Sequence, residues 1–235
     1  MEQLSGKTAI VTGASSGIGA AIAREIVKEG GNVVLAARRT EKLAELEREL
    51  VKYGNSKVLS VQTDVTKNHE VEALVKQAEQ KFQQIDFFIN NAGQMLTAPI
   101  RSGKVEEWET MIDVNIKGVI FGINAVLPTM IERSNGHIIN VCSVAGFEVT
   151  KASTVYSATK YAVRAISAGL EKELARTGVR VTNISPGMVD TSLTSNSGGH
   201  NERKKLETKD IAKAVIYAVT QPSYVNVNEI TVRPV

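Results

Sequence analysis

Two residues one helical turn apart have the types and spacing needed for proton transfer. Tyr156 and Lys160 lie four positions apart in an apolar segment with helical periodicity, which puts both side chains on one face. A free phenol loses its proton only near pH 10, and a cation one turn away favours the phenolate. The pair could therefore shuttle protons at neutral pH, although a surface pair with this spacing also arises by chance.

Two polar residues could act with this pair. Ser143 ends a predicted strand, where its hydroxyl could donate a hydrogen bond to a substrate carbonyl. Asn115 lies inside an apolar predicted helix, and a buried amide must be hydrogen-bonded. Either a role in the site or core hydrogen bonding would explain Asn115.

A glycine-rich turn follows the first predicted strand. Its glycines have the spacing G-x-x-x-G-x-G, not the G-x-G-x-x-G of the usual dinucleotide fingerprint. Gly13 would permit the tight turn, Gly17 the approach of a pyrophosphate, and Gly19 close packing of helix and strand. Backbone N–H groups at the helix start would then face the phosphates. The predicted cofactor contacts of this turn are Gly13, Ser15, Ser16, Gly17, Ile18 and Gly19.

The residues after the second predicted strand bear on the choice of cofactor. An acidic residue there would bind the ribose 2′-hydroxyl and favour NAD. The sequence has Arg38 and Arg39 instead, and guanidinium groups can hold a 2′-phosphate in bidentate fashion. We therefore expect NADP(H), with Arg38 the stronger contact; a solvated arginine pair is the alternative. Asp64, after the third strand, could accept from the adenine amino group or cap a turn.

Short, continuously apolar strands alternate with helical segments along the whole chain. The strands are expected at 8–12, 32–37, 58–63, 86–90, 137–143, 179–185 and 228–232, and the two longest helices at 106–127 and 154–176. Strands without alternation are typical of a parallel sheet with helices on both faces. The pattern predicts an α/β, single-domain Rossmann fold with a doubly wound seven-stranded parallel sheet over residues 1–235. A polar segment at about 188–206 is expected to be a flexible substrate lid.

Composition argues against several other classes of protein. A net charge of +3 gives no strong field toward nucleic acid or an anionic membrane, and no stretch approaches the roughly 18 apolar residues of a membrane span. The three histidines are scattered without ligand spacing, so no metal is expected. Cys142 is the only cysteine, and with a polar start that lacks a signal-peptide core it favours the cytoplasm. Ser143 has no evident His and Asp partners, which disfavours a hydrolase.

The ordered set of motifs resembles the short-chain dehydrogenase/reductase superfamily from Lys7 to about Val235. The resemblance implies that Tyr156 is the general acid or base and that Ser143 orients the carbonyl. Lys160 would stabilise the phenolate and bind the nicotinamide ribose, while Asn115 would hold a water that links Lys160 to solvent. Homodimers or homotetramers are common in the superfamily. The matching motifs are residues 12–19, 90–93, 115, 143, 156–160 and 186–191. The further cofactor residues implied are Val65, Asn91, Ala92, Gly93, Pro186, Gly187, Val189 and Thr191.

A narrower resemblance concerns the substrate. Residues 93–99, 111–118 and 230–234 resemble the subgroup of NADP-dependent 3-hydroxy acid dehydrogenases and clavulanic-acid dehydrogenase-like enzymes. It implies interconversion of a small-molecule secondary alcohol, a 3-hydroxy acid among the candidates, and its carbonyl. Residues 94–99 differ from the Thr-Arg-Asp common in 3-oxoacyl-carrier-protein reductases, which weakens that alternative. A catalytically silent NADP-sensing regulator is the alternative from another class, against which the intact Ser143, Tyr156 and Lys160 argue.

Overall fold

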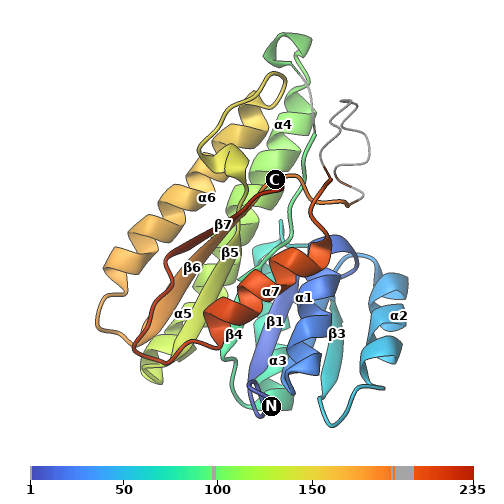
Figure 1. Cartoon of the computed structure of the whole chain (residues 1–235), viewed down its shortest axis with the longest axis vertical. Helices are drawn as coiled ribbons and strands as arrows, with labels where there is room; N and C mark the ends of the chain where they lie inside the picture. Colours follow the sequence, from blue (N-terminus) through green and yellow to red (C-terminus); the bar gives the residue numbers. More distant parts are fainter. Residues whose placement is uncertain (1, 97–98, 192, 194–203) are drawn as a thin grey trace.

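Seven parallel strands form the central sheet, in the order β3-β2-β1-β4-β5-β6-β7 (Figure 1). The order reverses between β1 and β4, so a crevice lies at the carboxyl ends of these two strands. The computed structural model describes residues 2–96, 99–191, 193 and 204–235. The predicted fold class is confirmed. The strands are β1 (Thr8–Thr12), β2 (Asn32–Ala37), β3 (Val58–Gln62), β4 (Phe87–Asn90), β5 (Gly136–Val141), β6 (Val179–Pro186) and β7 (Glu229–Val232).

Helices cover both faces of the sheet and create two apolar cores. Ala9 and Val11 of β1 pack into one core, and Ile10 between them packs into the other. Both faces are therefore dry, which explains why the strands are continuously apolar. The first core lies under α1 (Gly17–Lys28), α2 (Thr40–Leu50) and α7 (Thr208–Val219), and the second under α3 (Asn68–Phe82), α5 (Gly118–Glu132) and α6 (Thr154–Glu173).

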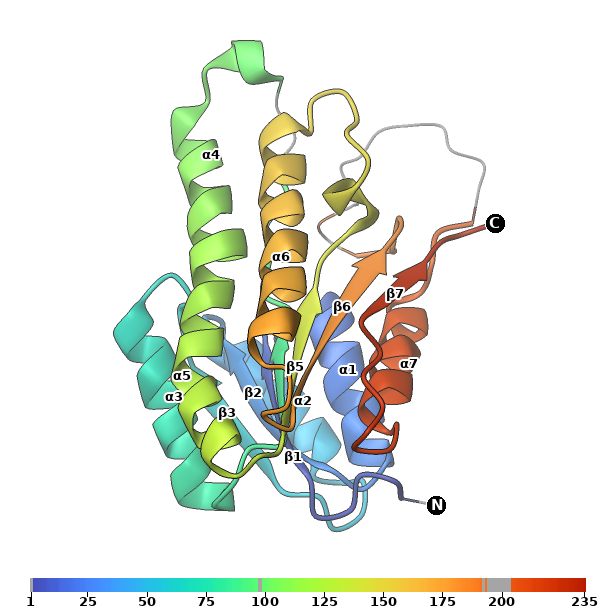
Figure 2. The ribbon, with the colours of Figure 1, turned by 90° about the vertical axis from the view of Figure 1, so that its left-hand side faces the viewer.

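The long helix expected at 106–127 has an internal irregularity. It runs from α4 (Val105–Ile112) through a π-helical turn, η2 (Asp113–Lys117), into α5, which ends at Glu132. Figure 2 shows this helix beside α6, both extending beyond the sheet. Such π-turns are frequent at functional sites, and this one contains Asn115. It places the site's helical wall above the crevice.

Several element ends differ from the expected ones. The helix expected to end at residue 176 ends at Glu173, and β5 ends at Val141 instead of residue 143. The physical reason at β5 is that Ser143 leaves the ladder and caps the short 3-10 helix η3 (Val144–Gly146). Ser143 therefore lies on the turn that follows the carboxyl end of β5.

Within the described residues, one helix could cross a membrane by length and composition alone. It is the stretch Val105–Glu132, whose most apolar window has a mean hydropathy of 1.5. The expectation that no stretch approaches such a span was therefore too strict. The α5 part packs against α3, β4 and β5, which is the position of a core helix in an α/β domain.

The expected lid at 188–206 lies largely outside the described residues. Its two described ends meet each other beyond β6. The Asp190 N–H donates to the Leu206 carbonyl at 2.8 Å, and the Leu206 N–H donates to the Met188 carbonyl at 2.9 Å. The two described ends of the expected lid therefore lie together at the carboxyl end of the sheet.

Candidate active site

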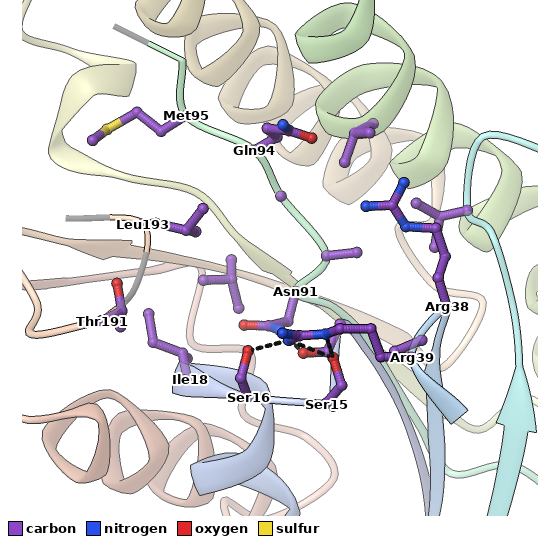
Figure 3. A pocket seen from close by; sticks show the side chains of 18 of the residues that line it. Ser15, Ser16, Ile18, Arg38, Arg39, Asn91, Gln94, Met95, Thr191 and Leu193 are labelled. Carbon is purple, nitrogen blue, oxygen red and sulfur yellow. Dashed lines mark hydrogen bonds between the residues drawn. The ribbon is translucent and has the colours of Figure 1, made fainter. Parts of the chain in front are cut away.

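A cleft of about 400 Å³ opens at the crevice between β1 and β4. Gln94, Met95 and Leu193 line one end, and the glycine-rich turn lines the other (Figure 3). The cleft brings together most of the predicted residues: Gly13, Ser15, Ser16, Gly17, Ile18, Arg38, Arg39, Asp64, Val65, Asn91, Ala92, Gly93, Tyr156, Lys160 and Thr191. Those outside its lining are Gly19, Asn115, Ser143, Pro186, Gly187 and Val189.

The three glycines of the turn are required for different reasons. Gly13 and Gly17 have φ of +66° and +57°, values that favour glycine. A Cβ on Gly13 would lie 2.8 Å from the Ala92 Cα, and one on Gly19 would lie 2.5 Å from the Asn91 Nδ2. A Cβ on Gly17 would meet nothing closer than 3.5 Å. Gly17 is therefore required for its backbone conformation, since a Cβ there would make only ordinary van der Waals contact with Thr191, whereas at Gly13 and Gly19 a Cβ would collide with the segment after β4.

Thr12 is a residue of the site that the sequence pattern did not reveal. Its Oγ1 donates to the Ile89 carbonyl at 3.1 Å and accepts from the N–H groups of Asn91 and Ala92 at 3.0 and 3.1 Å. The Asn91 Nδ2 donates to the Thr12 carbonyl at 2.8 Å. These bonds fix the turn after β4 against the glycine-rich turn. A hydroxyl at the last position of a strand, just before that turn, was the available signal.

The two arginines take different positions. The Arg39 Nη2 donates to Ser15 Oγ at 2.9 Å and to Ser16 Oγ at 2.7 Å. Figure 3 shows Arg39 across these serines and Arg38 pointing away from them. α1 begins at Gly17, directly after the two serines. The N–H groups of its first turn have no partner within the helix, so they are available beside Ser15 and Ser16. A guanidinium, two hydroxyls and helix-start N–H groups form a donor set that fits the phosphates of a dinucleotide.

Asp64 has the turn-capping role that the sequence left open. Its Oδ1 accepts from the Thr66 N–H at 3.0 Å and from the Thr66 hydroxyl at 2.9 Å. Because Asp64 also lines the cleft, an additional contact with adenine stays a prediction.

Tyr156 and Lys160 lie side by side on the face of α6 that lines the cleft. Lys160 is only 6% exposed, and its Nζ donates to the Val141 carbonyl at 3.1 Å. The same Nζ lies 5.9 Å from the centroid of the half-buried Tyr156 ring. A Cβ on Gly93 would come within 3.7 Å of this Nζ, so a glycine at 93 leaves room beside the cation. The result is a buried positive charge between the phenol and the segment after β4.

Ser143 and Cys142 leave β5 with different roles. The Ser143 Oγ accepts from the Ala145 N–H at 3.1 Å, so its own hydroxyl hydrogen is left to donate elsewhere. The Cys142 thiol donates to the Lys160 carbonyl at 3.2 Å, and burial raises the pKa of that thiol. Cys142 therefore has the properties expected of an inert core thiol.

The Asn115 side chain makes three hydrogen bonds within the protein. Its Oδ1 accepts from the Gln94 N–H at 2.8 Å, and its Nδ2 donates to the Gln94 carbonyl at 2.9 Å and to Thr159 Oγ1 at 3.0 Å. The core hydrogen bonding that the sequence left open is thus present. Both amide hydrogens are engaged, and the predicted contact of Asn115 with a water stays a prediction.

Comparisons with known proteins agree with this architecture. The family model described as short chain dehydrogenase matches residues 7–202. An uncharacterised oxidoreductase of Staphylococcus aureus (strain MW2) is 57% identical over 235 residues, which cover all of both chains. The serine dehydrogenase of Escherichia coli is 37% identical with a TM-score of 0.85, covering 96% of each chain. An alcohol dehydrogenase of Thermococcus sibiricus, complexed with 5-hydroxy-NADP, is 31% identical with a TM-score of 0.89, covering 96% of this chain and 95% of that one. The chain therefore belongs to the short-chain dehydrogenase family of oxidoreductases.

Proposed function

We propose that the protein interconverts a secondary alcohol and its carbonyl with NADP(H). The observation that carries this proposal is the single cleft that joins the phosphate-type donor set of the glycine-rich turn to Tyr156 and Lys160. When bound there, the nicotinamide supplies or accepts the hydride. The protein's own groups handle the proton and the charge on the substrate oxygen.

The proton chemistry follows from the side chains at the substrate end. The Ser143 hydroxyl donates to the substrate oxygen, since Ala145 occupies only an acceptor site of Oγ and leaves its hydrogen to donate. The Tyr156 hydroxyl gives its proton to that oxygen in reduction and takes it back in oxidation. Lys160, held by the Val141 carbonyl, stabilises the negative charge left on Tyr156. We assign contacts with the nicotinamide end of the cofactor to Pro186, Gly187, Val189 and Thr191.

We assign the choice of NADP(H) over NAD(H) to Arg38 and Arg39. Arg39 already lies on the serine hydroxyls of the glycine-rich turn, and Arg38 lines the other side of the same pocket. The 5-hydroxy-NADP bound to the Thermococcus sibiricus relative supports this choice. A hydrogen bond to a charged group is worth about 1.5–3 kcal/mol, so each Arg→Ala change should raise the KM for NADPH roughly tenfold or more. The KM for NADH should change little in both variants. Arg48→Ala, an exposed arginine outside the cleft, is the control, and equal effects on both cofactors would refute the assignment.

For the substrate we propose a 3-hydroxy acid. Serine is a 3-hydroxy acid whose hydroxyl is primary, so the likeness to the Escherichia coli serine dehydrogenase supports the position of the hydroxyl relative to the carboxylate. The test is a panel of 3-hydroxy acids, simple secondary alcohols and acetoacetyl thioesters, followed by the absorbance of the reduced nicotinamide with each cofactor. Highest kcat/KM on 3-hydroxy acids with NADP+ is the expected result. Highest kcat/KM on the thioesters would refute the substrate class, and no turnover of any member would favour a silent regulator.

We propose a cytoplasmic homo-oligomer as the working form. Support comes from exposed apolar side chains along the long helices: Ile112, Ile120, Ile131 and Tyr161 are each at least 40% exposed. Light scattering after size-exclusion chromatography should give a multiple of the 25.4 kDa chain mass. A mass of one chain at working concentration would contradict the proposal.

A further inference from the structure

Thr159 joins the two helices that carry the site residues. It is buried, with 1% of its surface exposed, and it lies between Tyr156 and Lys160 in the sequence. Its Oγ1 donates to the Tyr156 carbonyl at 2.7 Å and accepts from the Asn115 Nδ2 at 3.0 Å. One hydroxyl therefore links the turn of α6 that presents Tyr156 to the π-turn η2.

The connection continues from η2 to the wall of the cleft. Asn115 pairs with both polar backbone groups of Gln94, at 2.8 Å to its N–H and 2.9 Å to its carbonyl. Gln94 and Met95 line the cleft on the segment that follows β4 (Figure 3). Thr159 thus accepts a hydrogen bond from the Asn115 side-chain amide, and that amide in turn binds the backbone of Gln94.

Gly93 lies beside both groups of the site helices. A Cβ built on it would be in van der Waals contact with the Asn115 Oδ1, at 3.5 Å, and with the Lys160 Nζ, at 3.7 Å. Without the Thr159 hydroxyl, one hydrogen of the buried Asn115 amide would lose its acceptor. Such an orphaned donor is costly enough to make the amide turn or shift, and the Gln94 backbone would move with it.

We propose that Thr159 is a positioning residue that fixes the segment 93–95 relative to Tyr156 and Lys160. It sets the width of the cleft where nicotinamide and substrate would meet, without touching either. The expected effect on turnover rests on the proposed function, whereas the expected effect on the Gln94 backbone does not.

The test compares Thr159→Val with two other variants. Thr159→Val keeps the shape and removes the hydroxyl, and Thr159→Ser restores the hydroxyl. Ser167→Ala is the matched control: Ser167 is also buried on α6, donates to the Val163 carbonyl at 2.9 Å and accepts from a buried amide, the Asn140 Nδ2, at 2.9 Å. It orphans a buried asparagine on β5 in the same way, and the side chain of that asparagine bonds to Asn90 but not to Asn115 or Gln94. Hydrogen exchange of the Gln94 amide is measured together with kcat and the KM for NADPH.

In Thr159→Val we expect faster exchange of the Gln94 amide and a kcat lowered roughly ten- to hundredfold, the scale of a misplacement of about 1 Å. The KM for NADPH should change by less than about twofold, because the phosphate contacts lie at the other end of the cleft. Thr159→Ser should restore exchange and kcat, and Ser167→Ala should lower only the melting temperature.

Unchanged exchange of Gln94 in Thr159→Val, or an unchanged kcat, would overturn the proposal, as would an equal fall of kcat in Ser167→Ala. If the wild-type protein shows no turnover, the proposed function fails while the exchange measurement still decides the positioning role. Should Thr159→Val not fold, Thr159→Cys is read by the same criteria, since a thiol is only a weak hydrogen-bonding substitute.

Discussion

Replacing His137 by leucine should reduce the loss of stability that acid causes. His137 lies on β5 with none of its surface exposed, and its Nε2 is 2.7 Å from Thr182 Oγ1. The Thr182 hydroxyl hydrogen is donated to the Val227 carbonyl at 2.6 Å, so we infer that Nε2 carries the imidazole proton. Within the described part of the chain, the buried Nδ1 has no hydrogen-bond partner. Burial, with a smaller contribution from the charge of Arg180, lowers the pKa of His137 to about 3.

The magnitude follows from linkage between protonation and folding. In the unfolded chain this histidine titrates at its ordinary pKa of 6.5, whereas in the folded protein it stays neutral down to about pH 3. Only the unfolded state gains a proton in this window, so the free energy of unfolding falls by about 1.4 kcal/mol per pH unit below pH 6.5. By about pH 5 the loss from His137 alone is roughly 2 kcal/mol.

The assay is urea unfolding of the wild type and His137→Leu between about pH 8 and pH 5. Leucine has similar size and cannot titrate, and Thr182 keeps its bond to Val227. All other groups titrate in both proteins, so the difference between the two curves isolates His137. That difference should move by roughly 2 kcal/mol in favour of leucine as the pH falls. Parallel curves for the wild type and His137→Leu would refute the reasoning.

Three further outcomes can be checked directly. Gly19→Ala should destabilise the protein by about 1–3 kcal/mol in thermal unfolding, because its Cβ would lie 2.5 Å from the Asn91 Nδ2 and the Gly13 carbonyl oxygen; an unchanged melting temperature would contradict this. Gln83→Gly should stabilise the protein by about 1 kcal/mol, since Gln83 has φ of +70°, and a lower melting temperature would count against backbone strain there. Cys142 should resist iodoacetamide at neutral pH in the folded protein and react in urea, because burial raises the pKa of its thiol; rapid labelling of the native protein, followed by mass spectrometry, would show that this is wrong.

The sheet and the shared helix face of Tyr156 and Lys160 were accessible from sequence because each depends on local pattern. The apolar run of β1 signals a strand buried on both faces, and the spacing of Tyr156 and Lys160 puts them on one side of any α-helix. The glycine positions were also readable, since positive φ at Gly13 and Gly17 is a local backbone property.

What sequence could not supply depends on contacts between distant segments. A π-turn at 113–117 adds no distinct periodicity, so the helix was expected to be regular there. Asn115 is hydrogen-bonded to Gln94 and to Thr159, which lie 21 and 44 positions away from it in the sequence. The position of Arg39 on Ser15 and Ser16 likewise depends on how the ends of β1 and β2 are aligned in the sheet.

Tyr156→Phe is the most direct test of the proposed chemistry. The change removes the phenolic hydroxyl and keeps the ring beside Lys160, so the cleft should retain its shape. The account predicts that kcat falls by roughly 10²–10⁴-fold on the best substrate of the panel. The Kd for NADPH, measured by quenching of protein fluorescence, should stay within about twofold of the wild type, since the predicted phosphate contacts lie at the other end of the cleft. A variant that turned over at the wild-type rate would contradict the assignment of Tyr156 as the proton-transfer group.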